Sequence, residues 1–262
     1  MDRITSASNS TVKGLVLLRQ KVSRRRQSQS FVIEGERLVL DAPSEYLQEI
    51  YVTEKALEQN GAELEKKGLL ERTTLFSQEI MEKVSDTKTP QGILAVARQP
   101  QYEIKDLMAG DKTFLLLLED IQDPGNLGTM FRTAEAAGIT GIIMSRGTVD
   151  VFNPKVVRST MSAIFRQPFI CTEDFQGMLQ QLQQEGVSIL AACLEGSVPY
   201  YDADYRTPCA IAIGNEGNGL SEATIAQADE RVRIPMKGQI ESLNAAISAG
   251  ILMYEAARGN HS

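Results

Sequence analysis

Three short polar turns carry the side chains best suited to chemistry. They lie at 123–132, 213–219 and 234–244, each between an apolar run and a helical pattern. Such turns expose backbone N–H groups and place polar side chains at strand ends, where open α/β sheets bind ligands. The side chains on offer are Arg, Glu, Ser and Asn. An enzyme built on them must work by hydrogen bonding, charge and positioning.

Histidine-dependent chemistry is excluded by the residue count. The single histidine, His261, lies next to the end of the sequence, where chains usually fray. Ser-His-Asp hydrolysis, Cys-His catalysis and His-ligated zinc all need a positioned imidazole. Three widely spaced cysteines without a CxxC pattern are expected to be small core residues: Cys171, Cys193 and Cys209. The sequence therefore predicts no metal site.

The first turn has a structural explanation as well as a functional one. Asn126 is placed to cap a helix from Leu127, and Arg132 to form an ion pair with Glu135. Such a pair contributes only a few tenths of a kcal/mol. Nothing local decides between these structural roles and a role in a site.

The other two turns leave similar alternatives open. The turn at 214–219 has neither the GxGxxG spacing of a dinucleotide site nor the Lys of a phosphate-binding loop. Its Glu216 is either aimed into a cleft or merely exposed.

In the third turn, Ser242 is a natural N-cap for the last helix. That helix carries an apolar stripe that indicates either core packing or a subunit interface: Leu243, Ile247, Ile251 and Tyr254.

The surrounding pattern is a repeated β-α alternation. Four apolar runs predict parallel strands buried on both faces, at 114–119, 141–145, 187–192 and 210–213. Helical patterns are expected at 127–137, 153–162, 175–185, 221–228 and 242–258. A smaller α/β unit precedes them, with strands at 31–35, 50–53, 73–77 and 92–97 and helices at 36–42, 54–67 and 78–84. We expect a doubly wound parallel sheet after a smaller domain.

Four regions follow from this pattern. We predict a basic N-terminal arm at 1–30, a small α/β domain at 31–98, a linker at 99–111 and the main domain at 112–262. The arm holds seven basic residues and one acidic residue. Its run of Arg24, Arg25 and Arg26 is either a solvated terminus or a contact for phosphates.

Composition sets the broad class. The 262 residues are 42% hydrophobic and 23% charged, with a net charge of −7, so the whole surface is unsuited to indiscriminate nucleic-acid binding. No apolar run is long enough to span a bilayer, and the first residues lack the apolar core of a signal peptide. A cytoplasmic protein is the expectation.

Taken together and in this order, the three turns closely resemble the motifs of the SpoU/TrmH RNA 2′-O-ribose methyltransferases, members of the SPOUT superfamily. The segment 153–160 is similar to an intermediate helix of that family, where the resemblance implies Gly at the position of Ser162. Residues 31–98 resemble its substrate-binding domain. The resemblance implies an α/β fold with a C-terminal parallel-sheet methyltransferase domain tied in a trefoil knot, a homodimer, and S-adenosylmethionine as cofactor.

The resemblance also implies roles for individual residues. It places five polar residues in the catalytic region: Asn126, Arg132, Glu216, Ser242 and Asn244. Six more would hold the cofactor through backbone groups and apolar contacts: Leu194, Gly196, Gly214, Ile234, Met236 and Leu243. Asn126 and Arg132 are expected to meet Glu216 and Ser242 across the dimer.

The chemistry suits this inventory. A sulfonium methyl group is already activated, so its transfer to a ribose 2′-oxygen needs alignment and proton removal but no metal. In this family the arginine that corresponds to Arg132 is commonly described as the general base, yet a guanidinium in a protein stays protonated. We favour a role for Arg132 in holding an RNA phosphate and stabilising the developing alkoxide.

Two functions from different classes remain. The sequence favours an RNA ribose 2′-O-methyltransferase acting on 23S rRNA rather than tRNA, because a separate N-terminal domain precedes the motifs. The alternative is an RNA-binding protein of the same fold without catalytic activity. The intact motif residues argue against that alternative.

Overall fold

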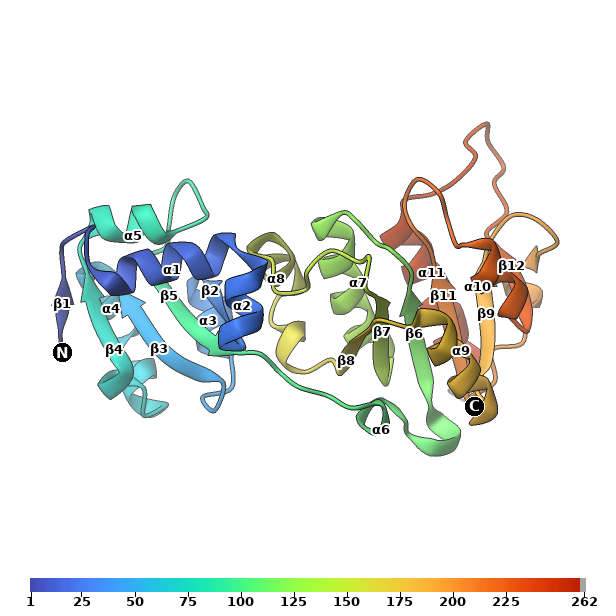
Figure 1. Cartoon of the computed structure of the whole chain (residues 1–262), viewed down its shortest axis with the longest axis horizontal. Helices are drawn as coiled ribbons and strands as arrows, with labels where there is room; N and C mark the ends of the chain where they lie inside the picture. Colours follow the sequence, from blue (N-terminus) through green and yellow to red (C-terminus); the bar gives the residue numbers. More distant parts are fainter. Residues whose placement is uncertain (260–262) are drawn as a thin grey trace. The chain divides into compact units, whose positions relative to one another are not determined.

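The structure, a computed structural model, describes residues 1–259 and forms two compact units, each built on its own sheet (Figure 1). The first unit comprises Met1–Pro100 with Asp150–Phe165, and the second comprises Gln101–Val149 with Arg166–Ser262. His261 lies outside the described residues. The predicted α/β class is confirmed for both units, while the segment 150–165 groups with the first unit instead of the main domain.

The first unit contains a five-stranded mixed sheet. Only β5 runs against its neighbours, pairing antiparallel with β2 and β3. The strand order is β1 (Arg3–Ile4), β4 (Thr73–Phe76), β3 (Leu47–Val52), β5 (Ile93–Arg98) and β2 (Ser30–Glu34). Consequently β2, β3 and β4 all end at one edge of the sheet, where the chain also enters β5.

The predicted basic arm is a folded part of this unit. Residues 1–30 form β1, α1 (Ser10–Gln20) and α2 (Val22–Ser28). Val12, Leu15 and Leu18 recur at the spacing of one helix face and are buried against the sheet and α5 (Gln78–Val84). Burying such side chains contributes about 1.5–3 kcal/mol each, which explains why α1 is not a solvated terminus. The two other helices of the unit are α3 (Glu36–Asp41) and α4 (Glu54–Lys66).

The segment 150–165 packs on the first unit through aromatic side chains. It forms α8 (Pro154–Thr160) and the 3₁₀ turn η3 (Ala163–Phe165). The ring of Phe31 lies 4.8 Å from that of Phe152 and 5.8 Å from that of Phe165, measured between centroids. Just before η3, Ser162 has a left-handed backbone with φ of +73°. This conformation is the physical reason for a glycine in the family pattern.

The second unit contains a seven-stranded sheet that is parallel throughout, as predicted. Its order is β10 (Val198–Pro199), β12 (Glu230–Arg233), β9 (Ser188–Ala192), β11 (Cys209–Ile213), β6 (Phe114–Leu118), β7 (Gly141–Ser145) and β8 (Phe169–Thr172). The central strands β11 and β6 are buried along their whole length, which accounts for their continuous apolar runs. The trefoil knot stays a prediction.

Helices cover both faces of this sheet. One core joins α9 (Phe175–Gln184) and α6 (Ile104–Leu107) to the sheet; α10 (Glu222–Gln227) packs beside α9. Elsewhere α7 (Pro124–Ala137) packs against α11 (Ala245–Gly259). Leu107 lies in the predicted linker yet is fully buried, and a Cβ at Gly141 would come within 2.2 Å of it. This part of the expected linker therefore belongs to the core. Three isolated 3₁₀ turns complete the chain: η1 (Leu70–Arg72), η2 (Gly110–Lys112) and η4 (Tyr200–Asp202).

The strand order reverses between β6 and β11. From β6 the chain continues outward to β7 and β8 on one side, while β9, β12 and β10 lie beyond β11 on the other. Ligands of open α/β sheets bind outside the carboxyl ends of the strands at such a point. Among the described residues, no helix has the length and apolar character needed to cross a membrane.

Candidate active site

The loops that follow β6 and β11 meet through one carboxylate. The Oε1 atom of Glu216 accepts hydrogen bonds from the Asp123 backbone N–H at 3.0 Å and from the Asn126 side-chain amide at 2.9 Å. Its Oε2 atom accepts from the Gln122 backbone N–H at 3.0 Å. Glu216 therefore joins the first and second polar turns through its carboxylate. The alternative that it is merely an exposed turn residue is wrong.

The third turn joins the same network through Asn244. Its side-chain amide donates to Oδ1 of Asn126 at 2.9 Å. Its own Oδ1 accepts from the backbone N–H groups of Ala246 at 2.9 Å and Ile247 at 3.3 Å, which makes Asn244 the cap of α11. The structure thus brings Asn126, Glu216 and Asn244 together within one chain, whereas we expected the first two to meet across a dimer.

Two capping assignments from the sequence are wrong. Helix α7 begins at Pro124, and its cap is Asp123, whose Oδ1 accepts from the Asn126 N–H at 2.8 Å. Proline at the first position fits, since its missing N–H has no partner there in any case. Because the cap is supplied by Asp123, the side chain of Asn126 is free to contact Glu216. Likewise Asn244, and not Ser242, caps α11.

Hydrogen bonding keeps Glu216 in its charged form. Partial removal from water acts to raise its pKa, but the amide of Asn126 and the backbone N–H groups of Gln122 and Asp123 act together in the opposite direction. The net pKa lies below the ordinary value for a glutamate. An ionised Glu216 serves to hold the loops in place and is poorly suited to accept a proton at neutral pH.

Arg132 presents a free guanidinium. It lies on α7, two turns beyond the start of the helix, and is exposed. Within residues 1–259 it makes no ion pair, because Glu135 pairs instead with Arg166. The local ion pair considered from the sequence is therefore wrong. An exposed guanidinium without a protein partner is available to a phosphate oxygen.

Ser242 stays outside the hydrogen-bond network. It lies exposed in the loop that leads from β12 to α11, and its hydroxyl has no hydrogen-bond partner among the described residues. Its predicted catalytic role has no geometric support from the network of Asn126, Glu216 and Asn244, and it stays a prediction.

The residues predicted to hold the cofactor follow three neighbouring strands. Leu194 and Gly196 come after β9, Gly214 after β11, and Ile234 and Met236 after β12; Leu243 lies shortly before α11. Since these strands are parallel and adjacent, their following loops share the carboxyl edge of the sheet. Leu194 is apolar yet 61% exposed there. Apolar side chains together with backbone polar groups are the usual lining of a small-molecule site, and they suit an adenine ring and an amino-acid tail.

Gly214 is required by close packing. A Cβ at this position would come within 2.1 Å of the backbone of Gly219 and Leu220. The turn between them is closed by backbone hydrogen bonds that Asn215 and Gly219 exchange at 2.9 and 3.0 Å. A glycine here therefore fixes the shape of the loop that carries Glu216.

A second support for these loops lies at Asp120, a residue that the sequence pattern does not single out. Asp120, two residues after β6, has a left-handed φ of +56°, and its Oδ1 accepts from the Ser145 hydroxyl at 2.6 Å. Its carbonyl accepts from the Asn215 side chain at 2.8 Å. A Cβ at Gly147 would come within 2.1 Å of the Asp120 carboxylate. The only sequence signal was a glycine two residues beyond a predicted strand.

The arginine run of the N-terminal segment divides into two environments. Arg24 and Arg26 are exposed on α2, in keeping with a phosphate contact. Arg25 is 3% exposed, and its guanidinium pairs with Asp150 at 2.6 Å and donates to the Leu18 carbonyl. The prediction that Arg25 contacts RNA does not fit this position, because its charge is already matched inside the first unit.

Comparison with known proteins identifies both parts of the chain. Residues 113–254 match the SpoU rRNA Methylase family, and residues 9–95 match the MRM3-like substrate binding domain. The chain is 34% identical, over 256 residues, to the 23S rRNA (guanosine(2553)-2′-O)-methyltransferase RlmP of Bacillus subtilis. That similarity covers 97% of this chain and 98% of the relative.

Solved structures agree over the full length. The AdoMet-bound rRNA methyltransferase from Sinorhizobium meliloti is 33% identical, with a TM-score of 0.87 over 100% of this chain and 99% of that one. An RNA 2′-O ribose methyltransferase is 31% identical, with a TM-score of 0.82 over 98% of both chains. The motifs, the fold and these relatives agree: the chain belongs to the SpoU rRNA methylase family.

Proposed function

We propose that this protein transfers the methyl group of S-adenosylmethionine to the ribose 2′-hydroxyl of a guanosine in 23S rRNA. The observation that carries this proposal is the network of Asn126, Glu216 and Asn244 at the point where the strand order reverses. The Bacillus relative, similar along nearly the whole chain, is named for this reaction on 23S rRNA. The Sinorhizobium relative is described with AdoMet bound.

The residues suit such a cofactor at the carboxyl edge of β9, β11 and β12. Its sulfonium supplies an already activated methyl group, so no metal is required. Leu194, Ile234 and Met236 offer apolar contacts, and Gly196, Gly214 and Leu243 offer backbone groups beside them. No group of three or more potential metal-binding side chains lies within residues 1–259.

The protein's own side chains orient the ribose, bind the phosphate and stabilise the developing charge. Glu216 stays ionised and holds Asn126, which is thereby fixed to orient the ribose. Arg132 is free to bind the phosphate next to the target nucleotide and to stabilise negative charge developing on the 2′-oxygen. Ser242 and Asn244 line the same approach in this proposal, with Asn244 also fixing the start of α11.

Single substitutions test the role of Arg132. Arg132→Ala is expected to lower kcat/KM by at least about 100-fold, while Arg132→Lys, which keeps the charge and loses the planar fork, retains part of the activity. Arg206→Ala serves as the control, since Arg206 is exposed in the same unit and pairs locally with Asp204. A fully active Arg132→Ala protein would remove any essential role for this residue.

The inactive alternative is separated by cofactor titration. We expect calorimetry to show one S-adenosylmethionine site per chain, lost on Gly214→Ala because the added Cβ displaces the loop backbone. A protein that binds 23S rRNA but no S-adenosylmethionine would support the inactive RNA-binding protein instead.

The homodimer is proposed on the exposed face of α11. Ile247 and Tyr254 on this helix are 56% and 54% exposed, whereas Ala249, Leu252 and Met253 on its other side are buried. The exposed stripe suits a second copy of this chain, in place of the core packing considered from the sequence. Sedimentation should show a dimer that Ile247→Asp dissociates, and a monomeric wild type would contradict this.

Arg24 and Arg26 remain the proposed phosphate contacts of α2. The double variant Arg24→Ala/Arg26→Ala should weaken RNA binding and lower the slope of log affinity against log salt by about one for each contact. Unchanged affinity and slope would show that this surface is simply solvated.

A further inference from the structure

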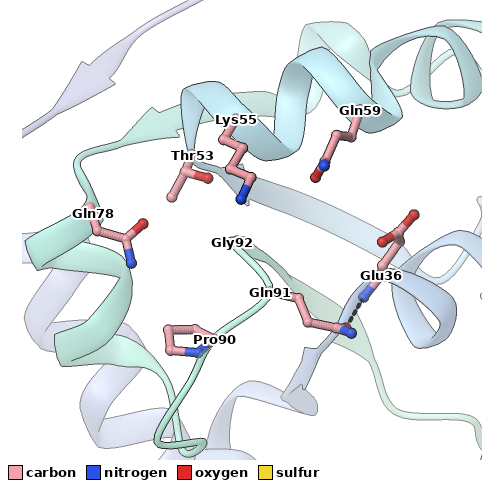
Figure 2. A pocket seen from close by; sticks show the side chains of 8 residues that line it. All are labelled: Glu36, Thr53, Lys55, Gln59, Gln78, Pro90, Gln91 and Gly92. Atoms are coloured by element: carbon pink, nitrogen blue, oxygen red, sulfur yellow. Dashed lines mark hydrogen bonds between the residues drawn. The ribbon is translucent and has the colours of Figure 1, made fainter.

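A polar pocket opens on the first unit at the edge where three strands end. β2, β3 and β4 run in the same direction, so the starts of α3, α4 and α5 gather there beside the entry to β5. The pocket is lined by Glu36, Thr53, Lys55, Gln59, Gln78, Pro90, Gln91 and Gly92 (Figure 2). It belongs to the unit without the methyl-transfer motifs.

Backbone hydrogen bonds join the segments that form the floor of this pocket. The Thr53 N–H donates to the Gly92 carbonyl at 2.8 Å, and the Gly35 N–H donates to the Ile93 carbonyl at 3.0 Å. Gly92 has a φ of +80°, and a Cβ there would come within 2.5 Å of the Thr53 hydroxyl. A side chain at Gly92 would therefore be strained and would crowd the Thr53 hydroxyl, which caps α4, so a glycine suits the floor of this pocket.

The rim carries amide groups with unused hydrogen-bonding capacity. Oε1 of Gln91 accepts from the Glu36 N–H at 2.8 Å, which leaves the Gln91 NH₂ free (Figure 2). Nε2 of Gln78 donates to Glu82 at 2.8 Å, which leaves the Gln78 carbonyl free. Gln59 makes no side-chain hydrogen bond within residues 1–259. The rim therefore offers at least one fixed donor, one fixed acceptor and one group that supplies both.

The single cation of the pocket lies at the start of α4. Lys55 is exposed, has no ion pair among the described residues, and points toward the middle of the lining residues in Figure 2. It sits in the first turn of a 13-residue helix, whose N-terminal dipole also favours an anion. One lysine opposed by Glu36 is too little charge for a di- or triphosphate, and one carboxylate is too few ligands for a metal ion.

This combination of groups matches one nucleotide. Amides that both donate and accept pair well with the edge of a nucleobase, and a lone cation matches one phosphodiester. Single-stranded RNA is recognised largely through such splayed-out bases. We propose that this pocket holds one unpaired nucleotide of the substrate RNA, with Gln59, Gln78 and Gln91 on the base edge and Lys55 on its phosphate. The inference rests on the proposed RNA substrate and assigns a second contact point on it, made by the unit that does not carry the methyl-transfer motifs.

Lys55→Ala and Gln59→Ala test this directly, because neither side chain has a hydrogen-bond or ion-pair partner among residues 1–259 to lose. Affinity for a 23S rRNA transcript is measured with the full chain and without S-adenosylmethionine, so that the result does not depend on catalysis. Each substitution should weaken binding by about tenfold, the value of one base-edge or phosphate contact. Lys66→Ala, at the far end of α4, is the matched control and should bind as the wild type does.

A second probe reports on the pocket itself. AMP, GMP, CMP and UMP are each added at millimolar concentration to the isotope-labelled protein, and side-chain amide signals are followed by NMR. We expect the signals of Gln59, Gln78 and Gln91 to shift, with one base favoured, and the shifts to be lost in Lys55→Ala.

The outcomes separate this inference from the proposed function. Wild-type RNA affinity in both variants, with no shift for any nucleotide, overturns the pocket assignment even when methyl transfer is intact. Weakened binding by the variants, with no methyl transfer by the wild type, supports the pocket and contradicts the proposed function. Failure of the wild type both to bind the transcript and to respond to the nucleotides overturns both.

Discussion

Ser162→Gly should make the protein more stable. Ser162 is 1% exposed, holds a left-handed φ of +73°, and its hydroxyl has no hydrogen-bond partner within the described residues. A left-handed backbone costs a residue with a Cβ about 1–2 kcal/mol, and an unpaired buried hydroxyl costs about 1–3 kcal/mol. Glycine removes both costs but adds about 0.5–1 kcal/mol of backbone entropy to be lost on folding. The expected net gain is about 1–4 kcal/mol.

Urea unfolding of the full chain measures this gain as a higher midpoint with an unchanged slope. The control is Ser159→Gly, three residues earlier inside α8, where glycine should instead destabilise by about 0.5–1 kcal/mol. Opposite signs for two identical substitutions in one segment would be hard to explain by any general effect of glycine. A Ser162→Gly protein no more stable than the wild type would refute the reasoning.

Three further substitutions test contacts within one or the other of the two units. Arg25→Ala should lower the free energy of unfolding in urea by about 3–5 kcal/mol, because Asp150 loses its buried ion-pair partner. The control Arg24→Ala should change this free energy by less than about 0.5 kcal/mol. Glu216→Gln should be less stable than the wild type at pH 7. Since the folded pKa of Glu216 is lowered, this difference is present above the unfolded value of about 4.3 and disappears as pH falls through the folded pKa. A pH-independent difference in the same titration would contradict the hydrogen-bonded carboxylate. Gly214→Ala should lower the free energy of unfolding by about 1–3 kcal/mol, and a wild-type urea midpoint would show that the loop can relax.

The sequence predicted best those elements whose burial is uniform. Strands β6, β7 and β11 are buried on both faces, so they appear as unbroken apolar runs. Strand β12 was missed because its sequence, Glu230–Arg233, has one buried residue, Val232, among charged ones. Helix α1 was missed for a related reason, since its lysine and arginine obscured a narrow face of three buried side chains.

The sequence singled out the three residues of the network, Asn126, Glu216 and Asn244, but it did not predict their contacts. Asp123 and Asn126 are chemically equivalent as helix caps, and so are Ser242 and Asn244. Only the backbone geometry of each turn decides which residue caps the helix. In the first turn Asp123 caps α7 and leaves Asn126 for the network, whereas in the third turn Asn244 both caps α11 and joins the network. The partners of Glu216 could not be predicted locally either, because the residues that donate to it lie 90 to 94 positions away along the chain.

Methyl transfer to RNA tests the central claim most directly. The purified protein is supplied with S-adenosylmethionine carrying a labelled methyl group and a 23S rRNA transcript, and the labelled nucleotide is mapped after alkaline hydrolysis. The predicted result is one label on the ribose 2′-oxygen of a guanosine, which makes the adjoining phosphodiester resistant to alkali, and its loss in Arg132→Ala. Label on a base, or no transfer to the transcript at all, would contradict the account.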